Sequence, residues 1–535
     1  MKKPLKFLLA FIFLFLTGNL QTALADKLED GVFSYQAGDY ETAYRLLLPL
    51  AIDGNPAVQT ILGMIFEKGQ GVPKSYKEAV KWYQLAAERG NVLAQNHLGQ
   101  IFANGLGFPK DHIEAFKWFQ LSADQGYALS QLSLGKMFYL GQGVQQDYSE
   151  AFKWFKLSAD QGVEESQYNL GVMYFQGQGV QKNYYEAFKI YEVLAIQGHA
   201  KARYNLGLMY YHGQGIKQDY GKAFKWFKLS SDQGLAVAQY NLAYMYDQGK
   251  GVSQDCKVAF DLYQLSAKQG NGLAQSNLGL MYSIRKGIFK NYKKAVKWLR
   301  LSAEQGVKEG QSNLGTMYEK GHGVLQDYKE AVKWYQLAAN QGFKDGQSNL
   351  GTMYKKGQGV PQDDKEAVKW FRFAADQGFE DAQFNLGVMY EKGQGVPQDY
   401  NKAFQWFKLS ADQGFALAQF HLGIIYEKGQ GVTQDYKEAI KWYQLSADQG
   451  YKSAQHTLGS IYETGKIGSK NYILAYMWFS MASAQGQKDA DNDKNSLEKK
   501  MSLSQVKEAK IIAKNQDRKT NNPEQPKPCT HQPSF

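Results

Sequence analysis

The sequence predicts an all-α protein, an α/α superhelical solenoid of twelve 36-residue helix-turn-helix repeats with capping helices at both ends. Three observations support this: glycine recurs every 36 residues, all ten tryptophans share one repeat position, and each copy carries the same helix-end signals. The 535 residues are 44% hydrophobic, which excludes global disorder. Since one such helix pair cannot bury its apolar faces alone, the copies must stack around a continuous interior.

The first 25 residues predict a bacterial signal peptide. Lys2 and Lys3 precede the apolar run Phe7–Leu16, which is too short to span a bilayer. Ala23 and Ala25 give the small-residue pattern of a cleavage site, so we expect cleavage after Ala25. The mature chain is therefore expected to be periplasmic or secreted, with no transmembrane segment.

The repeat is visible in two sets of residues. A reference glycine follows leucine near the middle of the first helix of each copy, and Ala243 replaces it once. The glycines are Gly63, Gly99, Gly135, Gly171, Gly207, Gly279, Gly315, Gly351, Gly387, Gly423 and Gly459. The tryptophans are Trp82, Trp118, Trp154, Trp226, Trp298, Trp334, Trp370, Trp406, Trp442 and Trp478. Such phasing identifies a repeated two-helix unit, whose helices we call A and B.

Helix B has clear signals at both ends. Asp, Asn or Ser precedes it in all twelve copies, as at Asp435, where the side chain can accept bonds from unpaired N–H groups. Glycine follows it in all twelve, as at Gly450. A Gly-x-Gly turn joins helix A to helix B, but Arg285 and Ile467 interrupt it, which predicts two altered turns.

Helical spacing predicts which faces are buried. In the fifth repeat, Ala202, Leu206 and Met209 lie on one side of helix A, and Trp226 and Phe227 lie on one side of helix B. We expect the tryptophans to fill the space between helices, so that truncating a buried one costs roughly 3–5 kcal/mol.

The pattern LGxMYxxGxGVxxDYxEAxKWFxLSADQG resembles the Sel-one-like repeat family, which is related to tetratricopeptide repeats. The resemblance implies an α-solenoid adaptor that holds protein partners together, often at a membrane or cell envelope. The expected organisation is a signal peptide at 1–25, a degenerate N-terminal capping repeat at 26–54, twelve repeats at 55–486, C-terminal capping helices at 487–514 and a disordered tail at 515–535.

Some secreted bacterial relatives carry a cysteine pair in every repeat and have been linked to penicillin binding or hydrolysis. This chain has only Cys256 and Cys529, so the resemblance disfavours a cell-wall or β-lactam hydrolase. The two cysteines could pair in an oxidising compartment, although nothing in their context suggests it. Cys256 stands where most copies have tyrosine and is more simply a small apolar substitution.

Three helix-A positions vary most between copies: three before, one after and four after the reference glycine. They fall opposite the predicted core, so we expect them to line the concave groove and bind protein or peptide partners. An alternative is that these rings pack against the next repeat. The candidate partner-binding residues are Tyr139, Tyr168, Phe175, Tyr204, Leu208, Tyr211, Tyr240, Tyr244, Phe384 and Phe420. We call this set the aromatic stripe.

A column of lysines, including Lys81 and Lys333, recurs on helix B and often follows glutamate by three residues. It indicates a solvated face, or else weak contact with an anionic envelope surface. We expect no catalytic, cofactor or metal site and no nucleic-acid partner, because the sequence lacks zinc, nucleophile-elbow and phosphate-loop motifs. The leading hypothesis is an exported scaffold; the alternatives are a secreted factor contacting host cells and the disfavoured hydrolase.

Overall fold

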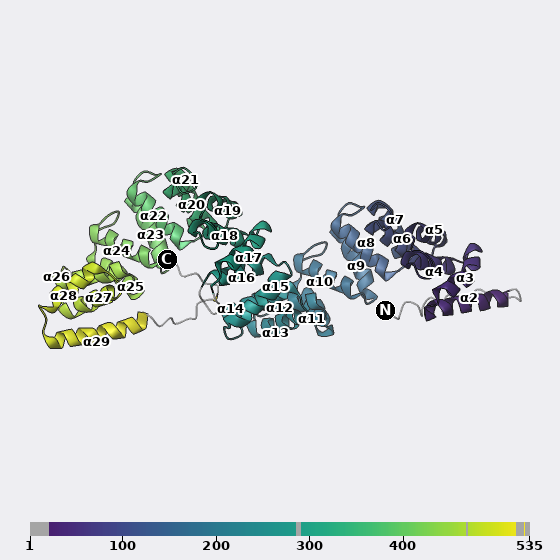
Figure 1. Cartoon of the computed structure of the whole chain (residues 1–535), viewed down its shortest axis with the longest axis horizontal. Coiled ribbons are helices and arrows are strands. Elements are labelled where there is room, and N and C mark those ends of the chain that lie inside the picture. Colours follow the sequence, from purple (N-terminus) through teal and green to yellow (C-terminus); the bar gives the residue numbers. More distant parts are fainter. Residues whose placement is uncertain (1–20, 285–289, 467–468, 521–528, 530–535) are drawn as a thin grey trace. The chain divides into compact units, whose positions relative to one another are not determined.

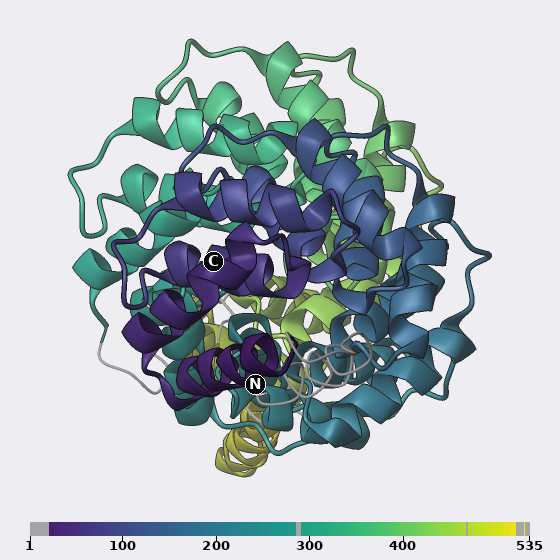
Figure 2. The same cartoon turned by 90° about the vertical axis from the view of Figure 1, so that its right-hand side faces the viewer.

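The computed structural model describes residues 21–284, 290–466, 469–520 and 529. Within these ranges all regular secondary structure is helical, in 28 helices, and no strand is present. The predicted all-α repeat fold is confirmed, and the alternation of paired helices can be followed in Figure 1 and in the turned view of Figure 2. The two turns interrupted by Arg285 and Ile467 lie outside the described residues.

Each repeat contributes one helix A and one helix B, numbered in chain order. The A helices are α4 (Pro56–Lys68), α6 (Val92–Asn104), α8 (Ala128–Leu140), α10 (Glu164–Gln176), α12 (Ala200–His212), α14 (Ala236–Gln248), α16 (Gly272–Ser283), α18 (Lys308–Lys320), α20 (Lys344–Lys356), α22 (Glu380–Lys392), α24 (Ala416–Lys428) and α26 (Lys452–Thr464).

The B helices alternate with them along the chain. They are α5 (Tyr76–Ala87), α7 (His112–Asp124), α9 (Tyr148–Asp160), α11 (Tyr184–Gln197), α13 (Tyr220–Ser231), α15 (Cys256–Lys268), α17 (Tyr292–Glu304), α19 (Tyr328–Asn340), α21 (Asp364–Asp376), α23 (Tyr400–Asp412), α25 (Tyr436–Asp448) and α27 (Tyr472–Ala484).

The predicted helix-B ends are confirmed. The side chain of Asp435 accepts hydrogen bonds from the backbone N–H groups of Lys437 and Glu438, at 2.8 and 3.1 Å. Gly450, which follows α25, has φ 85°, a left-handed conformation that glycine adopts without strain. Local chemistry therefore fixes where each B helix begins and ends.

The chain divides into two compact units, with the boundary between Leu229 and Ser230 in α13. Within each unit, helices that follow one another in the chain pack together, as α4 does with α5 and α22 with α23. A helices of successive repeats also contact one another, α4 with α6 in the first unit, and α16 with α18 and α18 with α20 in the second.

The reference glycine allows a ring of helix B to pack directly on the backbone of helix A. A Cβ placed on Gly315 would lie 2.7 Å from the ring of Tyr335, which is fully buried. The tryptophan prediction is therefore only partly right: four tryptophans are buried and six are half-buried, whereas the residue after each tryptophan is buried in every copy. The reason is geometric, since that next residue faces the glycine.

A glutamine relay joins three consecutive helices. In the second unit, the Gln383 side chain donates from Nε2 to the carbonyl oxygen of Ala375 on the preceding B helix, at 3.2 Å. Its Oε1 accepts from Nε2 of Gln413, which follows the next B helix, at 2.7 Å. Both bonds recur in seven other copies, at Gln95, Gln131, Gln275, Gln311, Gln347, Gln419 and Gln455.

Helix pairs cover both ends of the array. At the N-terminal end, α2 (Gln21–Ala37) packs on α3 (Tyr40–Ile52), and Leu28 and Val32 are buried. The expected cleavage site after Ala25 falls inside α2, ahead of these buried residues, while residues 1–20 lie outside the described part. At the other end, α28 (Lys488–Glu498) and α29 (Leu503–Thr520) both pack against α27.

The C-terminal segment differs from the expected disordered tail at two places. Helix α29 continues through residues 515–520, and Cys529 is fully buried in a disulfide with Cys256. The interpretation of Cys256 as a small apolar substitution is wrong, because its sulfur is bonded to a residue 273 positions away. Residues 521–528 and 530–535 of that tail lie outside the described residues.

Candidate partner-binding surface

The aromatic stripe lies on helix A and is partly covered by its own scaffold. Most of its residues are half-buried, and Phe384 is buried with 9% of its surface exposed. The structure therefore places these side chains on one face of the A helices, but none of them projects freely into solvent. Leu208 and Tyr244, one residue after the reference position, are half-buried as well.

Residues three before the reference position lean on the buried ring of helix B in the same repeat. In the first unit, the ring of Tyr168 lies 5.9 Å from that of Tyr191. The corresponding pairs are Tyr204–Phe227 at 5.8 Å, Tyr240–Tyr263 at 5.9 Å, Phe384–Phe407 at 5.5 Å and Phe420–Tyr443 at 5.5 Å. One face of each stripe ring is thus part of the scaffold.

Some of these rings also contact the following repeat. The hydroxyl of Tyr168 accepts a hydrogen bond from Nδ2 of Asn205 at 3.2 Å, and its ring lies 5.0 Å from that of His199. Phe420 lies 5.2 Å from Tyr451. For Tyr168 and Phe420, packing against the next repeat therefore covers part of the ring.

Residues four after the reference position meet the first residue of helix B. In three successive repeats the two positions hold aromatic rings in edge contact, 5.1–5.2 Å apart: Tyr139–Tyr148, Phe175–Tyr184 and Tyr211–Tyr220. The Tyr139 hydroxyl also donates to Oε1 of Gln178 at 2.7 Å, in the turn of the next repeat. These contacts hold the rings in place along the A-helix face.

In four other copies the same position is acidic and serves the core. The carboxylate of Glu319 accepts a hydrogen bond from the buried hydroxyl of Tyr335 at 2.6 Å. The equivalent pairs are Glu67–Tyr83 at 2.5 Å, Asp247–Tyr263 at 3.2 Å and Glu427–Tyr443 at 2.7 Å. The helix-B ring is tyrosine in all four of these copies. Part of the sequence variation at this helix-A position is therefore explained by whether the helix-B ring carries a hydroxyl that needs an acceptor.

Three tyrosines in this region, Tyr139, Tyr168 and Tyr335, have raised pKa values. Burial raises the pKa of Tyr168 and of Tyr139, and burial together with the Glu319 charge raises the pKa of Tyr335. A phenol with a raised pKa keeps its proton at neutral pH and acts as a hydrogen-bond donor. These side chains are suited to recognition through ring surfaces and hydroxyl groups.

The lysine column of helix B is largely paired. Lys333 lies 3.2 Å from Glu330, and six other lysines make the same contact at 2.6–3.3 Å: Lys81, Lys117, Lys153, Lys189, Lys369 and Lys441. Both partners are exposed, so each pair contributes little to stability. The pairing reduces the positive charge available to an anionic surface.

A second row of exposed side chains was missed in the sequence reasoning. One apolar residue on each of ten B helices is 38–53% exposed: Leu85, Leu121, Leu157, Val193, Leu265, Leu301, Leu337, Phe373, Leu409 and Leu445. The signal was available, because leucine recurs three residues after the tryptophan. We call it the B-helix leucine row.

Among the described residues, no group of three or more His, Cys, Asp or Glu side chains is arranged to hold a metal ion. No helix in the described part has both the length and the apolarity to cross a bilayer.

Comparison with known proteins agrees with the repeat pattern. The Sel1 repeat family model matches twelve consecutive 36-residue segments that cover residues 56–487. A solved structure of c5321, described as a protective antigen present in uropathogenic Escherichia coli strains and displaying an SLR fold, is 33% identical; the match covers 89% of this chain and 94% of that chain, with a TM-score of 0.64.

A Sel1 repeat protein from Oxalobacter formigenes is also 33% identical, with a TM-score of 0.43; the match covers 58% of this chain and 89% of that chain. A comparison with curated proteins gave no match.

Proposed function

Since this chain belongs to the Sel1 repeat family, we propose that it is an exported bacterial scaffold that binds protein or peptide partners along the A-helix face and has no catalytic role. One observation carries the proposal: the core positions of both helices stay apolar from repeat to repeat and are buried, whereas the three helix-A positions that change most between repeats share one face. A fixed frame with changing surface residues is suited to multivalent recognition.

Two observations support export. The N-terminal sequence has the features of a cleavable signal peptide, and Cys256 and Cys529 form a disulfide, a bond that persists in oxidising compartments such as the periplasm. Sequencing the N-terminus of protein from a periplasmic or culture fraction should give Asp26 as the first residue. Recovery of the chain only in the cytoplasm, with Lys2 retained, would contradict the export proposal.

The binding face is tested by crosslinking in intact cells. A photoreactive phenylalanine at Tyr204 on α12 should capture a partner identifiable by mass spectrometry, since the side chain there is half-buried and belongs to the aromatic stripe. The same group at Leu157 in the B-helix leucine row is the matched control, because that side chain is 48% exposed on the other helix layer. Capture from Leu157 alone would move the binding site to the B helices.

Replacement of Tyr204 and Tyr240 by alanine separates partner binding from packing. The proposal predicts reduced partner capture at a temperature where both variants remain folded. Because each ring also leans on a buried helix-B ring, some loss of stability is expected in addition. Lower stability with unchanged capture would show that the two rings serve the scaffold alone.

A second candidate function is contact with host cells after secretion. The specific observation in its favour is the likeness to c5321, which is described as a protective antigen of uropathogenic strains. Surface labelling and fractionation distinguish the two: a host-contact factor should be found outside the bacterium, whereas an envelope scaffold should stay in the periplasm. The hydrolase alternative is tested by nitrocefin turnover, and activity abolished by one point mutation would overturn the non-catalytic assignment.

A further inference from the structure

The sixth repeat has a cysteine at the first position of helix B, beside an acidic residue four after the reference position of helix A. The aromatic pairs Tyr139–Tyr148, Phe175–Tyr184 and Tyr211–Tyr220 are each nine residues apart and join helix A to helix B. In the next repeat the same two positions hold Asp247 and Cys256. Both aromatic side chains are thus absent from this repeat, and Cys529 is the residue that contacts both replacements.

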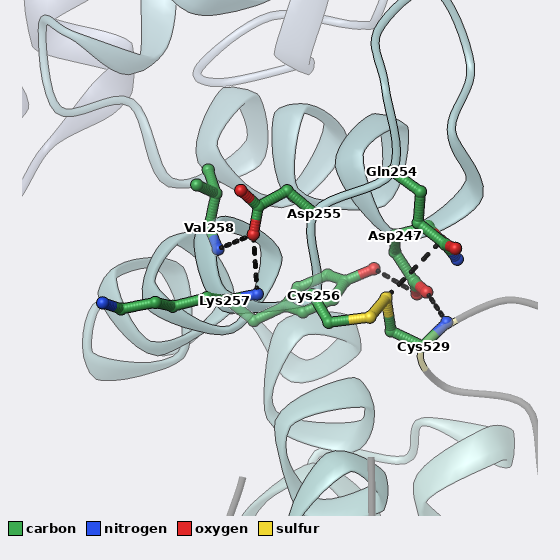
Figure 3. The surroundings of a disulfide bond; sticks show 8 residues. Asp247, Gln254, Asp255, Cys256, Lys257, Val258 and Cys529 are labelled. Atoms are coloured by element: carbon green, nitrogen blue, oxygen red, sulfur yellow. Dashed lines mark hydrogen bonds between the residues drawn. A yellow bond between two sulfur atoms is a disulfide. The ribbon is translucent and has the colours of Figure 1, made fainter. Parts of the chain in front are cut away.

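Cys529 is integrated into the A-helix face at this point. Its backbone N–H donates to Oδ1 of Asp247 at 2.6 Å, while Oδ2 of the same carboxylate accepts from the Tyr263 hydroxyl at 3.2 Å. The Sγ atom bonded to Cys256 lies 3.7 Å from the Asp247 carbonyl oxygen. Figure 3 shows Cys529 approaching the start of helix α15 with Asp247 turned toward its N–H group.

The contact is enclosed. Asp247 and Cys529 are both 0% exposed, and Cys529 packs with Ala243 and Tyr263 in one apolar cluster. A buried carboxylate must have its charge balanced by hydrogen bonds, and the Cys529 N–H group and the Tyr263 hydroxyl both contribute such bonds to Asp247. The donor on Cys529 is a main-chain N–H group, so this bond does not depend on the side chains of the residues next to Cys529.

Asp247 also belongs to the variable A-helix positions from which the aromatic stripe was defined. It lies four residues after the reference position, and Tyr240 and Tyr244 of the stripe are seven and three residues before it on the same face of α14. Cys529 therefore covers part of the A-helix face at α14. Under the proposed function, the corresponding part of this face in other repeats binds partners.

We propose that Cys529 is an intramolecular ligand of the A-helix face at α14, and that reduction of the Cys256–Cys529 disulfide releases it so that Asp247 can accept a backbone N–H of an extended partner peptide. This proposal rests on the proposed function for the claim that partners use this face. The docking of the tail itself depends only on the contacts described above.

The chemical step is a thiol–disulfide exchange. A dithiol reductant supplies two electrons and two protons, the bond between the two Sγ atoms breaks to give two thiols, and the reductant closes its own disulfide. After release, the carboxylate of Asp247 loses the hydrogen bond from the Cys529 N–H group. An N–H group from another extended chain restores the lost hydrogen bond, which explains why the vacated surface favours a peptide.

The test uses the full chain with Cys529 replaced. Cys529→Ser removes the disulfide but keeps the tail N–H, whereas Cys529→Pro removes both. In either variant Cys256 is the only thiol, since the chain has two cysteines. The probe is a synthetic peptide with the sequence of residues 521–535, its cysteine carried as a mixed disulfide with thionitrobenzoate.

Attack of the Cys256 thiolate on the peptide sulfur forms the Cys256–peptide disulfide and releases coloured thionitrobenzoate, whose rate of appearance is measured. Each rate is divided by the rate for a small disulfide reagent, which corrects for changes in thiol reactivity. The native probe should couple at least about tenfold faster than a scrambled peptide with cysteine at the same place, and faster to Cys529→Pro than to Cys529→Ser.

Removing the acceptor gives the decisive comparison. On the Cys529→Pro background, Asp247→Ala should slow coupling about 10- to 100-fold, because a hydrogen bond to a charged group is lost. Asp247→Asn keeps the shape and should slow it less. Glu319→Ala, at the equivalent position two repeats further on, is the matched control and should leave the rate unchanged.

Equal rates for native and scrambled probes, or an unchanged rate in Asp247→Asn and in a folded Asp247→Ala variant, would overturn the proposal. The assay contains no partner, so its failure is distinct from a failure of capture at Tyr204. For the reductive step, treatment of the wild-type chain with dithiothreitol should make Cys256 reactive toward iodoacetamide and remove the hydrogen-exchange protection of the Cys529 amide. Protection retained after reduction would show that the disulfide does not control release.

Discussion

The glutamine relay makes a quantitative prediction, because the first repeat has one of its two bonds and lacks the other. In Gln383→Met, a side chain of similar length fills the space but neither donates to Ala375 nor accepts from Gln413. Each lost partner keeps another bond: the Ala375 carbonyl accepts from the Gly378 N–H, and Gln413 Nε2 donates to Leu409. The expected cost is therefore two ordinary hydrogen bonds, about 2 kcal/mol in total.

Gln59 in the first repeat is the built-in control. Its Nε2 donates to the Ala51 carbonyl at 2.9 Å, but its Oε1 has no partner, because Arg89 replaces the glutamine of the other copies and bonds to the Gly54 carbonyl instead. Gln59→Met removes one bond and also the unsatisfied oxygen. We expect it to cost about 1 kcal/mol or less.

Amide hydrogen exchange is the suitable assay, since stacked repeats open locally and need not unfold in one step. The protection of amides in α21 and α22 should fall in Gln383→Met, and that of α3 and α4 should fall less in Gln59→Met. Equal losses in the two variants, or no loss in Gln383→Met, would refute the interpretation of the relay as a stabilising connection between repeats.

Two further predictions concern the core. Burial lowers the pKa of His421 to about 4, so on acidification this histidine takes up its proton in the unfolded chain before it does so in the folded one. The free energy of unfolding should therefore fall by about 3 kcal/mol as pH falls from 6.5 towards 4. His421→Asn restores the residue that most copies have. In urea unfolding, the free energy of unfolding of the variant minus that of the wild type should be larger at pH 4 than at pH 7. An equal difference at both pH values would count against this. Phe407→Ala should cost about 3–5 kcal/mol, and Trp406→Ala clearly less, because Phe407 is fully buried and Trp406 half-buried. Thermal unfolding of both variants measures the order, and a larger loss for Trp406→Ala would contradict it.

The helices could be predicted from sequence because their ends are marked locally. Asp435 and Gly450 bound α25 through backbone chemistry that needs no knowledge of the rest of the chain. The relay could not be predicted in the same way, because Gln383 and Gln413 read as ordinary polar residues until the helices that carry them are packed. Likewise, composition favours tryptophan as the core residue, and only the close approach of Tyr335 to Gly315 shows that the next residue fills that place.

The candidate surface was predicted in position but not in its degree of exposure. Helical phase places Tyr204 and Tyr240 opposite the core, whereas their contacts with Phe227 and Tyr263 depend on helix-packing distances that sequence does not contain. The disulfide was missed because its two cysteines are 273 residues apart. The available signal was Cys256 itself, because tyrosine holds that helix-B position in nine other copies.

The disulfide limits how many repeats can follow Cys256 but places no such limit on the number that precede it. Ahead of α14, a whole 36-residue module could be gained or lost while every glutamine still met its counterpart, so that variants of different length would remain foldable. Beyond α15, each added module would carry Thr520 further along the stack from Cys256, and only eight residues separate Thr520 from Cys529. Such a segment reaches about 30 Å at most. The disulfide can therefore form only when the number of repeats after Cys256 keeps Thr520 within that distance.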